Sequence, residues 1–138
     1  MPKPNFTGTW TWVPARSVLE ISPPDATLFV ITHQEPLLGI CRTHVVGDSR
    51  DTFSVDLTTD AHPIAVERSG LQMRGRAYWD GDALVFDTII VRAGEEATNV
   101  VRYTLSGDGR TLTAEERLRS GSRNYDNRWV FERAERSL

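Results

Sequence analysis

The sequence predicts an all-β protein, a single antiparallel up-and-down β-barrel of about 8–10 strands over residues 1–138. Apolar and polar residues alternate along most of the chain, with the period of strands that have one dry face. Seven prolines and ten glycines interrupt the chain at short intervals, and no segment shows a helical stripe. Consecutive hairpins without helices to cover them tend to close on themselves, which removes exposed edges. A two-sheet β-sandwich is the runner-up.

The expected strands follow one another with short turns between them. A helical turn is expected near residues 14–19, and Pro63 restricts a short strand in 61–67 to an edge or a start. The main strands are expected at about 8–13, 27–34, 39–46, 52–57, 71–79, 83–92, 98–105, 111–119 and 126–134.

The clearest hairpin covers residues 97–119 and turns at residues 106–109, where two glycines and an aspartate allow a tight reversal. Pairing Leu105 with Leu112 gives a dry face that contains Tyr103 and two polar residues, Asn99 and Glu116. Turns at residues 79–82 and 94–95 would then align Arg74, Asp87, Arg102 and Glu115 in a row of alternating charge on the wet face.

The first half of the chain has two readings that differ by one residue in register. In the preferred reading the inward residues are Leu28, Val30, Thr32, Cys41, Thr43, Val45, Phe53, Val55 and Leu57, and His33, Arg42 and His44 point outward. A one-residue slip in the loop at 47–51 would reverse this. Arg42 and His44 would then enter the interior, where they could hold a carboxylate or carbonyl group.

Composition and charge argue against several classes of function. A net charge of −3 gives no electrostatic basis for binding nucleic acid or an anionic membrane. The single cysteine, Cys41, excludes an intrachain disulfide and reads as a buried, inert thiol. The first residues show no apolar signal segment, so the chain is expected to be cytoplasmic.

Four segments carry a resemblance to a known family. Residues 6–10 (FTGTW) resemble the Gly-x-Trp start of lipocalin-like barrels, in which the tryptophan closes one end of the barrel. Residues 78–85 (YWDGDALV), 105–113 (LSGDGRTLT) and 130–134 (VFERA) are similar to bacterial lipocalin-like domains, most of them of unknown function. The resemblance implies a calycin-type barrel with an internal cavity for a small apolar molecule.

The dry face predicts which residues line the interior. They are mostly aromatic and aliphatic, as in small-molecule pockets. The predicted ligand-binding residues are Trp10, Trp12, Met73, Phe86, Thr88, Ile90, Val101, Leu118, Trp129 and Phe131.

Glu116 is the residue best suited to chemistry. A carboxyl group on the dry face is partly removed from water, which suits it to general acid or base work. Asn99, Asn127 and Tyr103 could orient it or hold a polar ligand group. The alternative places Glu116 near the barrel rim, hydrated or paired with an arginine.

No metal site and no cofactor are expected. His33 and His44 would lie roughly 13 Å apart along their hairpin, too far to share one ion. Phosphate-binding loops, dinucleotide fingerprints and serine-nucleophile motifs are absent from the sequence.

Three functions remain open. The leading hypothesis is binding of a small apolar or aromatic molecule inside the barrel. The alternative is a cofactor-free isomerase, cyclase or lyase that uses Glu116 as general acid or base in the same cavity. The third is a filled barrel that works through its surface, for example as a homodimer.

Overall fold

The computed structural model describes residues 3–68 and 70–134, which form one ten-stranded antiparallel sheet. The sheet order is β4-β3-β2-β1-β10-β9-β8-β7-β6-β5. The strands are β1 (Gly8–Trp12), β2 (Ala26–Gln34), β3 (Leu37–Val46), β4 (Ser49–Thr58), β5 (Ile64–Arg68), β6 (Leu71–Asp80), β7 (Ala83–Arg92), β8 (Glu95–Leu105), β9 (Thr111–Ser120) and β10 (Asn124–Arg133). Strands that are neighbours in sequence are neighbours in the sheet, except for β4 and β5, and β1 also pairs with β10. The predicted antiparallel up-and-down barrel is confirmed.

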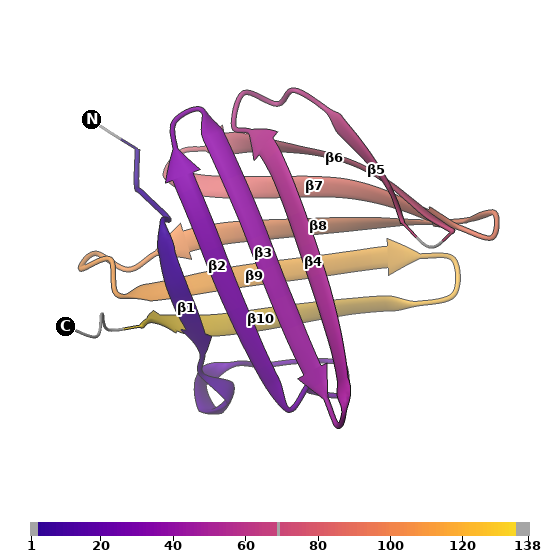
Figure 1. The fold of residues 1–138 in the computed structure, drawn as a ribbon, viewed down its shortest axis with the longest axis horizontal. Helices are drawn as coiled ribbons and strands as arrows, with labels where there is room; N and C mark the ends of the chain where they lie inside the picture. The colour runs from indigo at the N-terminus through magenta and orange to yellow at the C-terminus, as the bar shows by residue number, and fades with distance from the viewer. Residues whose placement is uncertain (1–2, 69, 135–138) are drawn as a thin grey trace.

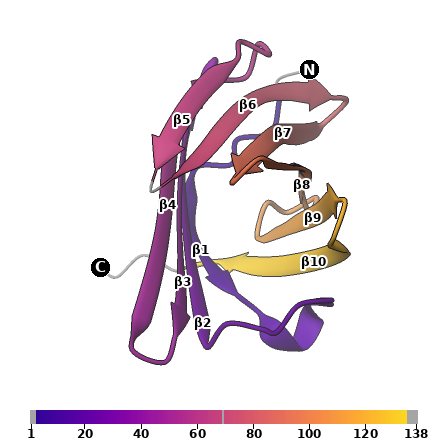
Figure 2. The same cartoon turned by 90° about the vertical axis from the view of Figure 1, so that its right-hand side faces the viewer.

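The single expected helical turn is also confirmed. It is the 3-10 helix η1 (Pro14–Arg16) in the connection from β1 to β2. This connection runs beside β10 (Figure 2), where Val18 and Arg128 form a backbone bridge. Among the residues described, no helix has the length and apolar character needed to cross a membrane.

The barrel has two walls and one seam. Strands β1 to β4 form a wall that crosses strands β6 to β10 at a steep angle (Figure 1). Strands β4 and β5 are the two ends of the sheet and share no backbone ladder. Arg68 of β5 bridges this seam, because its Nη1 donates to the Thr52 carbonyl at 2.6 Å and its Nη2 lies 3.4 Å from Asp51. As expected, β5 follows Pro63 and is an edge strand.

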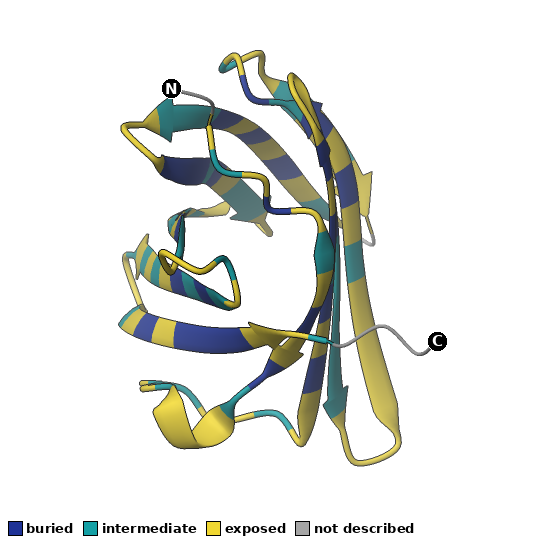
Figure 3. Ribbon diagram, turned by 90° about the vertical axis from the view of Figure 1, so that its left-hand side faces the viewer, coloured by how far each residue is buried: buried dark blue, intermediate teal, exposed yellow. Residues whose placement is uncertain are grey.

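The core lies between the walls and follows the alternation of the sequence (Figure 3). In the second half of the chain the predicted faces are correct: Tyr103 and Trp129 are buried, and Arg102 is exposed. Leu105 pairs with Leu112, as the hairpin predicted.

The predicted row of alternating charges is wrong, because two turns each lie one residue away from their expected position. Asp80 pairs with Ala83, so Arg76, and not Arg74, lies opposite Asp87. The next turn uses residues 93 and 94, one residue earlier than predicted, so Arg102 lies opposite Val85.

The misplacement of the second turn, at residues 93 and 94, has a clear cause in the backbone. Both residues of this turn have positive φ, 51° for Ala93 and 80° for Gly94, and alanine is not expected in such a conformation. Each error moves the register by two residues and therefore leaves the faces unchanged. Of the predicted row, the pair Arg102 and Glu115 is confirmed.

The preferred reading of the first half is wrong for β2 and β3. Phe29, Ile31, His33, Leu38 and Ile40 are buried in the interior. The six residues expected inside, Leu28, Val30, Thr32, Cys41, Thr43 and Val45, alternate with the buried residues and occupy the outer face. Only β4 has the predicted orientation, with Val55 and Leu57 buried and Phe53 half-buried.

This reversal has a physical reason: the outer face of β2 and β3 is itself apolar, so alternation does not distinguish the two sides. Leu28 is 49% exposed on that face. Cys41, predicted to be buried, is a free thiol and only half-buried there.

One end of the barrel is closed by aromatic side chains. Trp10 is fully buried, its Nε1 donates to the Phe6 carbonyl at 3.0 Å, and the Arg133 guanidinium lies 4.4 Å from the centre of its ring. This is the position that the resemblance implied for the Gly-x-Trp tryptophan. At the same end Glu35 links β2 to β6, because its carboxylate accepts hydrogen bonds from His33 and Trp79. Burial raises the pKa of Glu35, but these hydrogen bonds outweigh burial and leave the pKa below its usual value.

Candidate ligand-binding cavity

The interior holds a cavity of about 510 Å³ between the two walls. This volume is within the range of small-molecule sites, roughly 300–1,000 Å³. The barrel is therefore hollow rather than filled. The lining reaches from the buried core to the seam, where Asp51, Ser54, Val66 and Arg68 border it.

Most of the predicted site residues line this cavity. Seven of the predicted ligand-binding residues line it: Met73, Phe86, Thr88, Ile90, Val101, Trp129 and Phe131. Three of the predicted catalytic residues line it as well: Glu116, Tyr103 and Asn99. They come from β6 to β10, the half of the barrel whose faces the sequence predicted correctly.

Four predicted residues lie outside the lining. Trp10 plugs the closed end, and Trp12 packs behind the cavity with its ring centre 5.5 Å from that of Trp129. Leu118 is half-buried further along β9. Asn127 is buried beside Glu116 without bordering the cavity.

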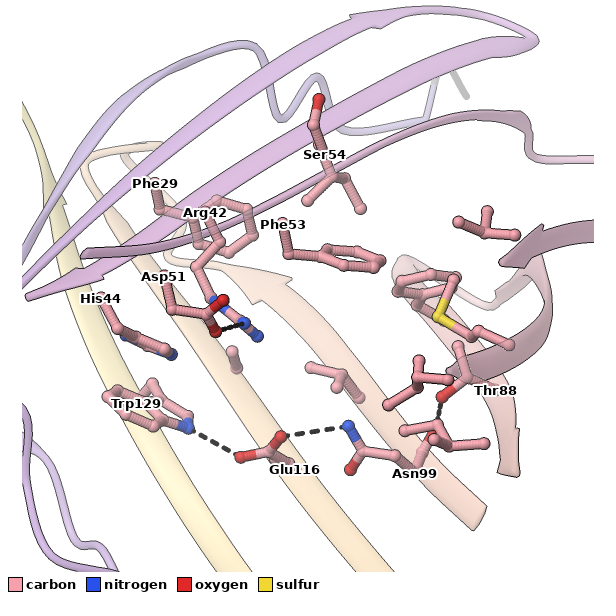
Figure 4. A pocket seen from close by; sticks show the side chains of 18 of the residues that line it. Phe29, Arg42, His44, Asp51, Phe53, Ser54, Thr88, Asn99, Glu116 and Trp129 are labelled. Carbon is pink, nitrogen blue, oxygen red and sulfur yellow. Dashed lines mark hydrogen bonds and ion pairs between the residues drawn. The ribbon is translucent and has the colours of Figure 1, made fainter. Parts of the chain in front are cut away.

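Glu116 is held by three N–H donors, two of which, from Trp129 and Asn99, are drawn in Figure 4. Its Oε1 accepts from Asn127 Nδ2 at 2.9 Å and from Trp129 Nε1 at 3.0 Å, and its Oε2 accepts from Asn99 Nδ2 at 3.1 Å. Within residues 3–68 and 70–134 Glu116 has no arginine as its partner, which was one form of the rim alternative, and its side chain is half-buried. All three hydrogen bonds reach the carboxyl oxygens from N–H groups, which can only donate.

The two asparagines beside Glu116 differ in one respect. Asn127 is bonded at both ends, because its Oδ1 also accepts from the Glu20 backbone N–H at 2.8 Å. Asn99 is bonded only through its nitrogen, and its Oδ1 is buried without a partner among the residues described. Asn127 therefore acts as a fixed support, whereas Asn99 keeps an unused acceptor in the cavity wall.

The opposite wall brings in charged residues that the preferred reading placed outside. Arg42 and His44 of β3 and Asp51 of β4 project toward the Glu116 wall in Figure 4. Arg42 contacts Asp51 at 3.7 Å, and its Nε is buried without a partner in the described chain. The one-residue slip considered above predicts this arrangement, so the residues could be found from sequence but the choice of register could not.

His44 is a neutral part of this wall. Its ring stacks on Trp129 with 5.3 Å between ring centres, and its Nδ1 is 2.8 Å from Thr27 Oγ1. Burial, together with the charge of Arg42, lowers the pKa of His44 to about 4, against the opposing effect of Asp51 and Glu116. Burial likewise raises the pKa of Tyr103, so its hydroxyl stays protonated.

Because of His44, we expect the free energy of unfolding to fall in mild acid. Below the ordinary pKa of 6.5, the unfolded chain gains a proton that the folded protein does not bind until pH about 4, so stability decreases as the pH falls through this window. Since the ring is only partly buried, the expected loss is about 1–2 kcal/mol. Urea unfolding at pH 7 and pH 5 measures it, and the variant His44→Gln should show a smaller difference. An equal difference in the variant would contradict this origin.

A metal centre has no support in the geometry. Among residues 3–68 and 70–134, no group of three or more histidine, cysteine, aspartate or glutamate side chains could hold an ion. His33 is buried at the closed end, where it lies opposite Leu38. His44 is six residues beyond Leu38 on β3, so the two histidines are far apart along the hairpin.

Comparison with known proteins identifies the fold but no family. No protein-family model and no curated protein matches the chain. Secretory abundant heat soluble protein 4 from Ramazzottius varieornatus has a similar structure, with a TM-score of 0.62, 16% identity, and coverage of 98% of this chain and 99% of that one. A mutant of the fluorescent protein UnaG gives a TM-score of 0.59 at 16% identity, covering 95% and 97%.

A third similar structure contains a ligand. It is the fatty acid binding protein of Schistosoma mansoni in complex with arachidonic acid, with a TM-score of 0.56, 10% identity, and coverage of 94% and 96%. Identities this low establish a shared barrel fold and nothing about the residues of the site.

Proposed function

We propose that this protein binds a small, mostly apolar molecule inside the barrel, with one polar group of the ligand placed at Glu116. The observation that carries the proposal is the cavity of about 510 Å³, whose mostly apolar lining includes the half-buried carboxylate of Glu116. Apolar walls with a few fixed polar groups are typical of ligand sites. The fatty acid binding protein supports this reading, because a barrel of the same fold holds arachidonic acid.

The geometry favours binding over catalysis for Glu116. Its three N–H partners, at 2.9–3.1 Å, occupy most of the accepting positions with which the carboxylate would take a proton from a substrate, and they hold it in place to orient a polar ligand group. The role of Glu116 in an isomerase, cyclase or lyase stays a prediction. Such a role would be established by an enzymatic turnover that falls by orders of magnitude in the variant Glu116→Gln.

The proposed function is tested with a neutral, apolar fluorescent probe. Nile red should bind with a stoichiometry of one per chain, its emission should shift to the blue, and it should quench tryptophan fluorescence, because Trp129 lines the cavity. Absence of saturable binding, together with absence of displacement by any long-chain compound, would overturn the proposal.

A further inference from the structure

Two polar atoms of the cavity residues are buried without a hydrogen-bond partner in the described part of the chain. One is the Nε of Arg42, which can only donate, and the other is the Oδ1 of Asn99, which can only accept. Burying such atoms unpaired costs roughly 1–3 kcal/mol each. Both residues line the same cavity, from opposite walls.

The orientation of the Asn99 amide is fixed by its neighbour. An ionised carboxylate accepts hydrogen bonds and donates none, so the Asn99 nitrogen has to face Glu116. Turning the amide over would bring two acceptors together. The Asn99 oxygen is therefore held away from Glu116, unpaired.

Glu116 itself has further accepting capacity. Each carboxylate oxygen can accept about two hydrogen bonds. Oε1 accepts two, from Asn127 and Trp129, whereas Oε2 accepts one, from Asn99. The wall formed by β8 and β9 thus has unused acceptors, at Glu116 Oε2 and at Asn99 Oδ1.

The facing wall, formed by β3 and β4, instead has unused hydrogen-bond donors. Arg42 has five N–H donors, and its one ion pair in the cavity, with Asp51, is long at 3.7 Å. Its guanidinium also lies 5.7 Å from the centre of the Phe53 ring. His44 beside it carries no charge at neutral pH. Two further arginines, Arg68 and Arg92, border the cavity, and Arg68 pairs with Asp51 and the Thr52 carbonyl.

We propose that the polar end of the ligand is an uncharged amide group, whose N–H donates to the Glu116 and Asn99 wall and whose carbonyl accepts from Arg42. This inference rests on the proposed function and specifies the class of ligand. A free carboxylate has no N–H to offer and would bring a second negative charge next to Glu116. An amide supplies both a donor and an acceptor, as the two walls require.

The test compares two compounds that differ only at the polar end. Decanamide and decanoate are titrated against the Nile red complex at neutral pH. Wild-type protein should release the probe at a decanamide concentration at least tenfold below that of decanoate. Decanoate that competes as well as decanamide would overturn the inference.

The variant Glu116→Gln removes the unused acceptors with little change in shape. The glutamine carbonyl can replace Oε1 for Asn127 and Trp129, and its NH₂ can pair with the Asn99 oxygen after that amide turns over. The preference for decanamide should then fall to within a factor of about three. The matched control is Glu115→Gln, one residue along β9, where the side chain is exposed and pairs with Arg128; it should keep the wild-type preference.

The outcomes separate the two proposals. Failure of Nile red and of both compounds to bind wild-type protein would remove the proposed function itself. Binding of Nile red and of both compounds without a preference would leave the proposed function in place and remove the amide inference. A preference for decanamide that persists in Glu116→Gln would also contradict the amide inference. If that variant does not fold, the comparison of the two compounds on wild-type protein still tests the inference.

Discussion

The substitution Val101→Trp is expected to weaken Nile red binding at least tenfold while the protein stays folded. Val101 lines the cavity, opposite Phe86 on one neighbouring strand and Glu116 on the other. A tryptophan at this position occupies the space that the ligand needs. Because the site is a void and not a packed core, the larger side chain should cost no more than about 1–3 kcal/mol.

The matched control is Ile89→Trp on β7. Ile89 is 39% exposed on the outer face, so the same residue type is added without entering the cavity. Its affinity for Nile red should equal that of the wild type. Equal affinity in both variants would show that the probe binds elsewhere.

The second large effect is on stability: Trp10→Ala should lower the free energy of unfolding by about 3–5 kcal/mol. Trp10 has no exposed surface, and its removal leaves a void beneath the Arg133 side chain and frees the Phe6 carbonyl. Urea denaturation followed by circular dichroism gives the value.

Trp79→Ala is the comparison for Trp10. Trp79 lies at the same end of the barrel, but it is only half-buried, so the loss should be clearly smaller. A loss from Trp79→Ala as large as that from Trp10→Ala would contradict the assignment of Trp10 as the plug of the barrel.

The second half of the chain shows what alternation alone can predict. In β6 to β10 the wet face carries most of the charged residues, and Glu116 is an exception on the dry face. The two sides were therefore identified correctly even where two turns were misplaced. Turn errors of one residue shift a hairpin register by two, which preserves the faces. Glu116, Asn99, Asn127 and Trp129 were therefore brought together correctly, because their grouping depends on the β8–β9 and β9–β10 registers.

The first half shows where such reasoning fails. On β3, Cys41, Thr43 and Val45 look as suited to a core as Ile40, while Arg42 and His44 look suited to the surface. The protein places the polar pair inside because they form the wall of a cavity rather than a packed core. Polar residues at inward positions violate the usual pattern where a site requires it, and a single sequence does not mark that violation.

The most direct test of a hollow, ligand-binding interior is a proton–nitrogen NMR spectrum of the four indole N–H groups. Each has a different partner: Phe6 for Trp10, Ser17 for Trp12, Glu35 for Trp79 and Glu116 for Trp129. Only Trp129 lines the cavity, so decanamide should move the Trp129 signal well beyond the other three. A Trp129 signal that stays fixed at saturating ligand, or moves less than that of Trp79, would contradict the account.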